Sequence, residues 1–247
     1  MVNRNLTISL NPGFLIWQVI FPLIYIFVAG FAYAPLIHGV PFGGKELDYP
    51  AFLASGMIGF NIMNSTLISG IIIWNDRKYG MFEQIMSGPF TRSHYILSNI
   101  CTIGIVGLLS ASLIVVIGYP VFFESVEFSF VTIPIIIFCA ITGSILFGSL
   151  ASIISTRLRS SEGFNVVINT VFLLSAFVST AFYPAEGVPE PLRSAFYLNP
   201  LTYLVDIIRA GIFGTITELI IYEMIVLVGI ASVLFIIASK LLTKLDF

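Results

Sequence analysis

The chain of 247 residues carries few charges for its length: 11 Lys and Arg and 13 Asp and Glu make up 10% of it, while 57% of its residues are hydrophobic. Soluble domains carry about 25% charged residues, so this composition excludes the soluble globular classes and indicates a membrane protein. The net charge of -2 and the scattered basic residues also exclude a nucleic-acid-binding surface, and we expect no nucleic-acid partner.

The charged residues divide the chain into six long apolar stretches. Because a charge in the middle of a bilayer is strongly unfavourable, such gaps mark membrane spans. They predict spans at about residues 14–37, 51–74, 96–123, 131–156, 164–183 and 219–239. The first stretch is too long for the apolar core of a signal peptide, so we expect it to be retained. The expected fold is an all-α integral membrane protein that forms a single domain over residues 1–247.

The basic residues predict the orientation of the chain. Eight Lys and Arg lie at the two termini and in the loops after the second and fourth spans, against three in the other loops. Positive residues are held on the cytoplasmic side, so both termini are expected to be cytoplasmic. The protein is expected in the cell membrane as a multi-pass protein.

Residues 75–95, in the cytoplasmic loop after the second span, contain a short amphipathic pattern. Met81, Phe82, Ile85 and Met86 recur on one face of a helix of about two turns, and Gly88 with Pro89 ends it. Such a helix either lies at the headgroup boundary of the membrane or presents a face to a partner protein, and periodicity alone leaves both open.

Residues 184–217, in the extracellular loop before the last span, predict two short amphipathic helices. Asn199 and Pro200 suit an N-cap and a first helical position, and Asp206 and Arg209 are spaced as an ion pair on the polar side. Each helix is too short to cross a membrane. They either dip into the outer leaflet, cap a pathway, or lie at the interface as a simple connection.

No motif for catalysis or cofactor binding is expected in this chain. Residues 39–45 fit the first seven places of a phosphate-binding loop, but Glu46 stands where Ser or Thr is required and no strand is expected before it. We interpret this segment as a Gly/Pro turn between two spans. His38 and His94 have no partner at metal-ligand spacing, so no metal site is expected. The chain is therefore expected not to be an enzyme.

The six spans and two motifs together resemble the ABC-2 type membrane subunits of ATP-binding cassette exporters. The motifs are DRKYGMFEQIMSGPFTR at residues 76–92 and NPLTYLVDIIRAGIFG at residues 199–214. The resemblance implies that the first motif couples the chain to an ATPase subunit through Arg77, Gly80, Glu83 and Arg92, and we add Phe82 from the same helix. Gly88, inserted before the proline, departs from the family pattern. The second motif places Asn199, Pro200, Asp206 and Arg209 in extracellular re-entrant helices.

The same resemblance implies the partners. A separate nucleotide-binding subunit would use ATP and Mg, while this chain binds no cofactor and forms a homodimer in the lipid bilayer. The short N-terminus before the first span resembles the drug- and lipid-type branch more than the polysaccharide branch.

Polar residues in two spans are candidates for lining a transport pathway: Asn61, Ser65, Ser69, Asn165 and Asn169. They either line a pathway or bond neighbouring helices, and both interpretations stay open. An uncharged lining suits a lipid-like, amphipathic or neutral cargo such as a drug or lipid. The expected function is the permease subunit of an exporter. The alternatives are a polysaccharide or glycolipid exporter permease, a membrane assembly protein that transports nothing, and a passive channel.

Overall fold

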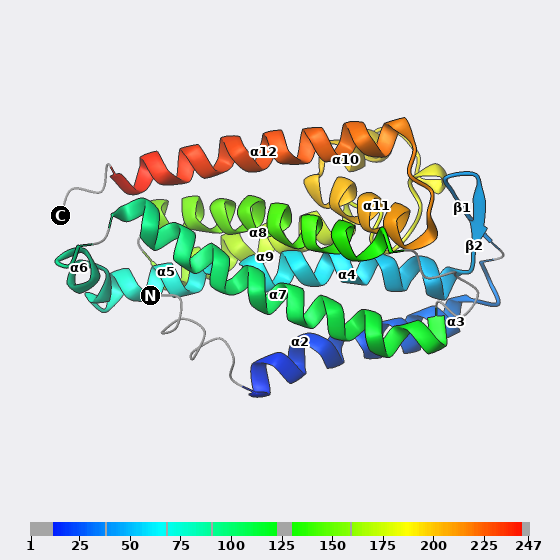
Figure 1. Ribbon diagram of the computed structural model, residues 1–247, viewed down its shortest axis with the longest axis horizontal. Coiled ribbons are helices and arrows are strands. Elements are labelled where there is room, and N and C mark those ends of the chain that lie inside the picture. Colours follow the sequence, from blue (N-terminus) through cyan, green and yellow to red (C-terminus); the bar gives the residue numbers. More distant parts are fainter. Residues whose placement is uncertain are drawn as a thin grey trace.

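The computed structural model describes residues 12–37, 39–67, 69–89, 91–122, 130–158 and 160–243. They form an elongated bundle of long helices (Figure 1). By length and composition, five helices within these residues could cross a membrane, at Ile16–Tyr33, Tyr49–Lys78, His94–Phe122, Thr132–Arg157 and Glu218–Leu241. The expected all-α membrane protein is confirmed at this level.

The elements follow one another in the order expected from the charge gaps. The long ones are α2 (Pro12–Tyr25), continued by the π-helical turn η1 (Ile26–Gly30) and α3 (Phe31–Tyr33), then α4 (Tyr49–Leu67), α5 (Ser69–Lys78), α7 (Arg92–Phe122), α8 (Thr132–Arg157), α9 (Ser161–Phe177) and α12 (Glu218–Thr243). The short ones are β1 (Val40–Phe42), β2 (Lys45–Leu47), α6 (Met81–Met86), the 3-10 turn η2 (Ala185–Gly187), α10 (Leu192–Leu198) and α11 (Pro200–Phe213).

Helix α4 forms the centre of the bundle, where it packs against α7, α8 and α11. Glycines of α4 allow close contact both with α11 and with the segment after α9. A Cβ atom at Gly56 would lie 2.0 Å from the carbonyl oxygen of Ala181, and one at Gly59 would lie 2.7 Å from the Val205 side chain. Small residues at helix contacts let backbones approach closely, which is how helices associate in membranes.

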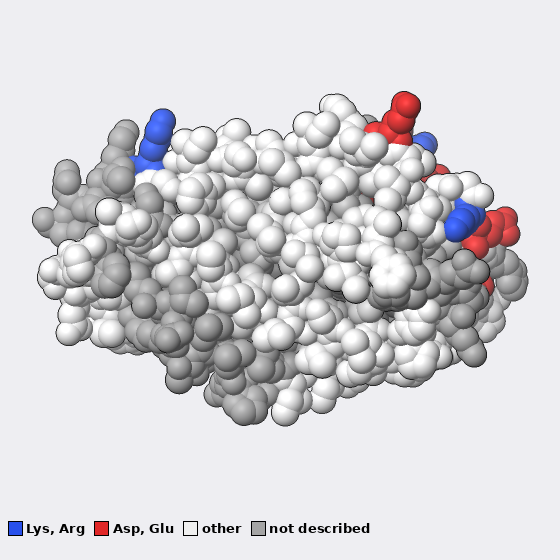
Figure 2. All heavy atoms as spheres, viewed as in Figure 1, with Lys and Arg blue, Asp and Glu red and all other residues white. Residues whose placement is uncertain are grey.

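The outside of the bundle is apolar over most of its length. Figure 2 shows charged side chains near the two ends of the visible face and none across its middle. Large apolar side chains such as Trp17, Val116 and Ile225 are more than half exposed. In water such a surface would aggregate, whereas lipid tails cover it without penalty.

The fifth predicted span ends earlier than expected. The sequence pattern predicts a helix to residue 183, but α9 ends at Phe177 and the chain then turns. The Asn199 side chain explains the stop: its Nδ2 donates to the carbonyl oxygens of Ser175 at 2.7 Å and Val178 at 2.5 Å. These carbonyls at the helix end are satisfied from a distant residue, so the apolar run need not continue as helix.

The segment interpreted as a Gly/Pro turn is a β-hairpin. Strands β1 and β2 pair antiparallel, with Phe42 opposite Lys45. Gly43 and Gly44 connect them with φ angles of +55° and +80°, the conformation of a two-residue hairpin turn, which glycine adopts without strain. The hairpin lies at the same end of the bundle as α10 and α11 (Figure 1).

Candidate functional site

The predicted coupling segment forms an elbow at one end of the bundle. Helix α5 ends at Lys78, and Gly80, with a φ of +70°, turns the chain into α6. Only glycine adopts this backbone angle easily, so Gly80 has a structural reason to be there. Figure 1 places α6 beyond the ends of α5 and α7, at the end opposite the hairpin.

Phe82 anchors α6 to the bundle. Its side chain is 1% exposed and lies in a small apolar cluster with Ile73, Tyr95, Ile96 and Ile100 from α5 and α7. The Phe82 and Tyr95 rings meet edge to face, with centroids 5.1 Å apart. The coupling role predicted for Phe82 stays a prediction; its ring faces inward and holds α6 in place.

The outer face of α6 is polar except at its first residue. Glu83 and Gln84 are exposed, Met81 is 39% exposed, and Tyr79 just before the helix is 70% exposed. Glu83 therefore lies on the surface, where a partner could reach it.

Arg77 faces the bundle rather than the outer surface. It is half-buried, and its Nη1 donates to the carbonyl oxygen of Ser155 in the last turns of α8. The neighbouring Asp76 accepts a 2.7 Å hydrogen bond from the Tyr95 hydroxyl. These bonds tie the start of the elbow to α7 and α8. The backbone of Arg92 begins α7, but its side chain lies outside the described residues.

The polar residues of the second span bond to other helices of the same chain. Asn61 donates to the Ser110 hydroxyl of α7 at 2.8 Å, and Ser65 donates to Gln18 of α2 at 3.0 Å. Both are fully buried. Their geometry suits helix packing. The side chain of Ser69 lies outside the described residues.

The polar residues of α9 have a different setting. Asn165 and Asn169 are exposed on its surface, and Asn169 Nδ2 bonds only along the helix, to the Asn165 carbonyl oxygen at 2.8 Å. Thr170, also exposed, bonds back to the Val166 carbonyl oxygen. Within the described part of the chain, no hydrogen bond joins Asn165 or Asn169 to Asn61 or Ser65.

At the other end, Asn199 and Pro200 begin α11 as expected. Asn199 Oδ1 accepts from the Leu201 N–H at 3.0 Å, which is the N-cap bond, while its Nδ2 holds the end of α9. Gly214, with a φ of +67°, ends the helix. One residue thus joins the end of α9 to the start of α11.

The Asp206–Arg209 pair is present but lies inside the protein rather than on a solvated face. Arg209 is 1% exposed, and its Nη1 lies 3.0 Å from Asp206 Oδ1. Its other nitrogens donate to the Ser55 hydroxyl and to the carbonyl oxygens of Phe52 and Thr180.

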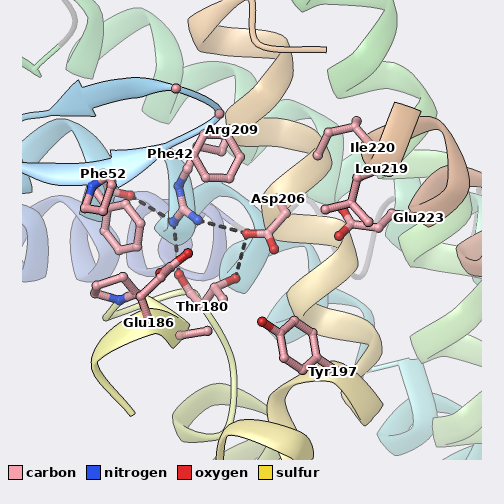
Figure 3. A pocket seen from close by; sticks show the side chains of 15 residues that line it. Phe42, Phe52, Thr180, Glu186, Tyr197, Asp206, Arg209, Leu219, Ile220 and Glu223 are labelled. Atoms are coloured by element: carbon pink, nitrogen blue, oxygen red, sulfur yellow. Dashed lines mark hydrogen bonds and ion pairs between the residues drawn. The ribbon is translucent and has the colours of Figure 1, made fainter. Parts of the chain in front are cut away.

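Aromatic and hydrogen-bonding groups complete the surroundings of this pair (Figure 3). The Phe52 ring lies 3.7 Å from the guanidinium carbon, within cation–π distance. The Thr180 hydroxyl donates to Asp206 at 2.8 Å. Burial raises the pKa of the Asp206 carboxyl to about 6, although Arg209 and Thr180 act in the opposite direction.

A pocket adjoins the pair, and its lining includes Glu223, for which no role was predicted from the sequence. Glu223, in the second turn of α12, lines this pocket together with Asp206 and Arg209. A signal was present: Glu223 is the only charged residue inside the otherwise apolar predicted span 219–239. An ionisable residue within a span indicates a functional site. By contrast, no feature of the sequence marked Tyr95, whose ring packs against Phe82 at the other end of the bundle.

Comparison with known proteins identifies the family. The family model for the ABC-2 type transporter matches residues 1–213. A transport permease, ycf38, of Cyanophora paradoxa is 27% identical over 212 residues, covering 81% of this chain and 68% of that protein. Its namesake in Porphyra purpurea is 27% identical, covering 81% and 67%. Nodulation protein J of Rhizobium meliloti (strain 1021) is 24% identical, covering 78% and 72%. The chain is thus a multi-pass membrane permease that belongs to the ABC-2 type transporter family, whose members pair with an ATPase subunit.

Proposed function

We propose that this chain is the permease subunit of an exporter that moves an amphipathic or lipid-like molecule out across the cell membrane. A separate subunit would hydrolyse ATP with Mg, and this chain would be neither an enzyme nor a cofactor-binding protein. Its membership of the ABC-2 type family supports the division between permease and ATPase.

The observation that carries the proposal is the orientation of α6. A helix that merely lies on a membrane keeps its apolar face for lipid. Here Phe82, the largest apolar residue of α6, is already buried within the chain, and Glu83 and Gln84 are exposed. An anchored helix with a polar outer face supports docking to a protein partner.

We further propose six membrane crossings, with both termini cytoplasmic. Helix α9 has 17 residues, which at 1.5 Å per residue gives about 25 Å, slightly less than the roughly 30 Å hydrocarbon core. The chain after Phe177 would complete the crossing. With this topology α6 lies on the cytoplasmic side, and α10 and α11 form the re-entrant extracellular pair.

The exposed polar face of α9 supports a homodimer. Asn165 and Asn169 would otherwise face lipid, where unsatisfied amide groups are unfavourable. A second copy of the chain can supply partners, and a pathway between the two copies would then be lined by these asparagines. We assign this role to α9, since Asn61 and Ser65 bond within the chain.

Reconstitution tests the proposal. The chain is placed in proteoliposomes with and without its ATPase subunit, and nucleotide-dependent flux is measured with drugs, lipids and glycans. We expect flux of a drug or lipid only with the ATPase present. Flux of glycans alone would favour the polysaccharide branch, and no flux of any compound would favour an assembly protein. ATP hydrolysis by the chain alone would contradict the division of labour.

A charge reversal tests the docking surface. Glu83→Lys should uncouple the partner's hydrolysis from flux, because it inverts the charge of the exposed face of α6. Glu46→Lys is the matched control, since Glu46 is also exposed but lies in strand β2, at the end of the bundle opposite α6. It should transport normally. Equal flux in both variants would remove the argument for docking through α6.

A further inference from the structure

At the end of the bundle opposite α6, a pocket of about 270 Å³ lies between the β-hairpin, η2, α11 and the start of α12. Figure 3 shows Glu186, Asp206 and Glu223 around it, with Tyr197 at one side and Phe42 and Phe52 near the guanidinium of Arg209. The pocket is therefore lined by carboxylates and aromatic rings.

Arg209, the single basic residue that lines the pocket, does not neutralise these carboxylates. Each nitrogen of Arg209 is already engaged, with Asp206, Ser55, and the carbonyl oxygens of Phe52 and Thr180. The positive charge of Arg209 is thus paired within the wall of the pocket.

Glu223 has no such compensation. Its side chain is 7% exposed, and its Oε2 atom, although buried, has no hydrogen-bond partner among the residues that the structure describes. Figure 3 shows its carboxylate directed toward Asp206, a group of like charge. By contrast, Glu186 at the rim interacts electrostatically with Arg193. A buried carboxylate without a hydrogen bond or counter-charge is unfavourable, so this position calls for a cation.

The chemistry of the pocket favours an organic cation over a metal ion. Within the described residues, no three His, Cys, Asp or Glu side chains come together as metal ligands. An ammonium group needs less: one or two carboxylate oxygens that accept its N–H bonds, and aromatic rings that stabilise its charge. Glu223 and Tyr197 provide these two elements in one pocket.

We propose that this pocket binds an ammonium group, with the Glu223 carboxylate as its counter-charge and hydrogen-bond acceptor. The ligand is either a free amine or the headgroup of an amino-lipid in the adjacent leaflet, both of which present the same cation. The proposal is independent of export and of the coupling role of α6.

The test uses the purified full-length chain in lipid nanodiscs made of phosphatidylglycerol, with ethanolamine as the probe and binding measured by calorimetry. N-acetylethanolamine, which has a similar size but no charge, is the control ligand. We expect ethanolamine to bind and N-acetylethanolamine not to bind. Glu223→Gln should weaken ethanolamine binding at least tenfold. The control Glu218→Gln, an exposed glutamate of the same helix that does not line the pocket, should bind like the unaltered chain.

A second set of nanodiscs distinguishes the two ligand sources. If the site takes a lipid headgroup, phosphatidylethanolamine in the disc should raise the unfolding temperature of the unaltered chain, but not that of Glu223→Gln, and should compete with ethanolamine. If it takes a free amine, ethanolamine should bind equally in both discs.

Two results would overturn the proposal. One is equal ethanolamine affinity in the unaltered chain and in Glu223→Gln. The other is the absence of both ethanolamine binding and stabilisation by phosphatidylethanolamine, in which case the buried Glu223 carries a proton instead of pairing with a cation. Glu223→Gln removes an unpaired buried charge while keeping the size of the side chain, so we expect it to fold at least as stably, and its unfolding temperature verifies this.

Discussion

Arg209→Met is the most informative single change, because Arg209 joins three separate parts of the chain. Its guanidinium, 1% exposed, donates to Ser55 and the Phe52 carbonyl of α4, to the Thr180 carbonyl after α9, and to Asp206 of its own helix. Met has a comparable length and an apolar character, so the change removes the charge and the donors while filling most of the space.

The expected loss of stability follows from the group left behind. Breaking a buried ion pair by removing one partner destabilises a protein by about 3–5 kcal/mol, because the other charge remains buried without compensation. In a domain of this size about 1 kcal/mol shifts the unfolding temperature by roughly 2–4 °C, so we expect a decrease of about 6–20 °C. Arg209→Lys keeps the charge but loses the planar fork of donors, and should also be destabilised.

The assay is thermal unfolding of the purified chain in detergent. Arg157→Met is the control, since Arg157 is exposed at the last residue of α8, and surface changes shift stability by only about ±0.5 kcal/mol. The double variant Asp206→Asn with Arg209→Met should be less destabilised than the sum of the two single variants, because it leaves no orphaned charge. If Arg209→Met unfolded at the temperature of the unaltered chain, the network would not stabilise this end of the bundle.

Three further changes test other parts of the structure. Phe82→Ala should release α6 from Tyr95, with a loss of about 3–5 kcal/mol in the free energy of unfolding, as is typical for a buried Phe. Amide hydrogen exchange in residues 80–89 should become faster. Unchanged exchange would contradict the anchoring role. Gly56→Ala places a methyl group 2.0 Å from the Ala181 carbonyl oxygen and should force α4 away from it. An unfolding temperature equal to that of the unaltered chain would contradict this close contact. Asn199→Ala removes an N-cap and the bonds that end α9, and should lower the free energy of unfolding by about 0.5–2 kcal/mol. The measurement is thermal unfolding, with Ser194→Ala on the exposed surface of α10 as the comparison.

The spans could be predicted from the sequence because the unfavourable burial of charge acts on each residue separately. Five of the six predicted spans correspond to helices long enough to cross a membrane. The end of α9 could not be predicted, because it is determined by Asn199, a residue more than twenty positions away that satisfies its last carbonyl groups. Local apolar runs carry no information about such distant bonds.

The same limit applies to the candidate site, where local spacing could be predicted from the sequence but contacts with distant segments could not. Helical spacing predicted that Asp206 and Arg209 would pair, since residues three apart face each other on any helix. It could not show that the pair is buried, because burial depends on α4 and on the segment after α9. Likewise, periodicity placed Phe82 on the apolar face of α6, but only the position of Tyr95 shows that this face turns inward.

The most direct test of the account is photo-crosslinking from α6 in the complex of this chain with its ATPase subunit. A photoreactive residue at position 84, which is exposed on the outer face of α6, should crosslink to the ATPase. The same residue at position 186, exposed at the opposite end of the bundle, should not. Crosslinks from position 186 and none from position 84 would contradict the assignment of α6 as the coupling element.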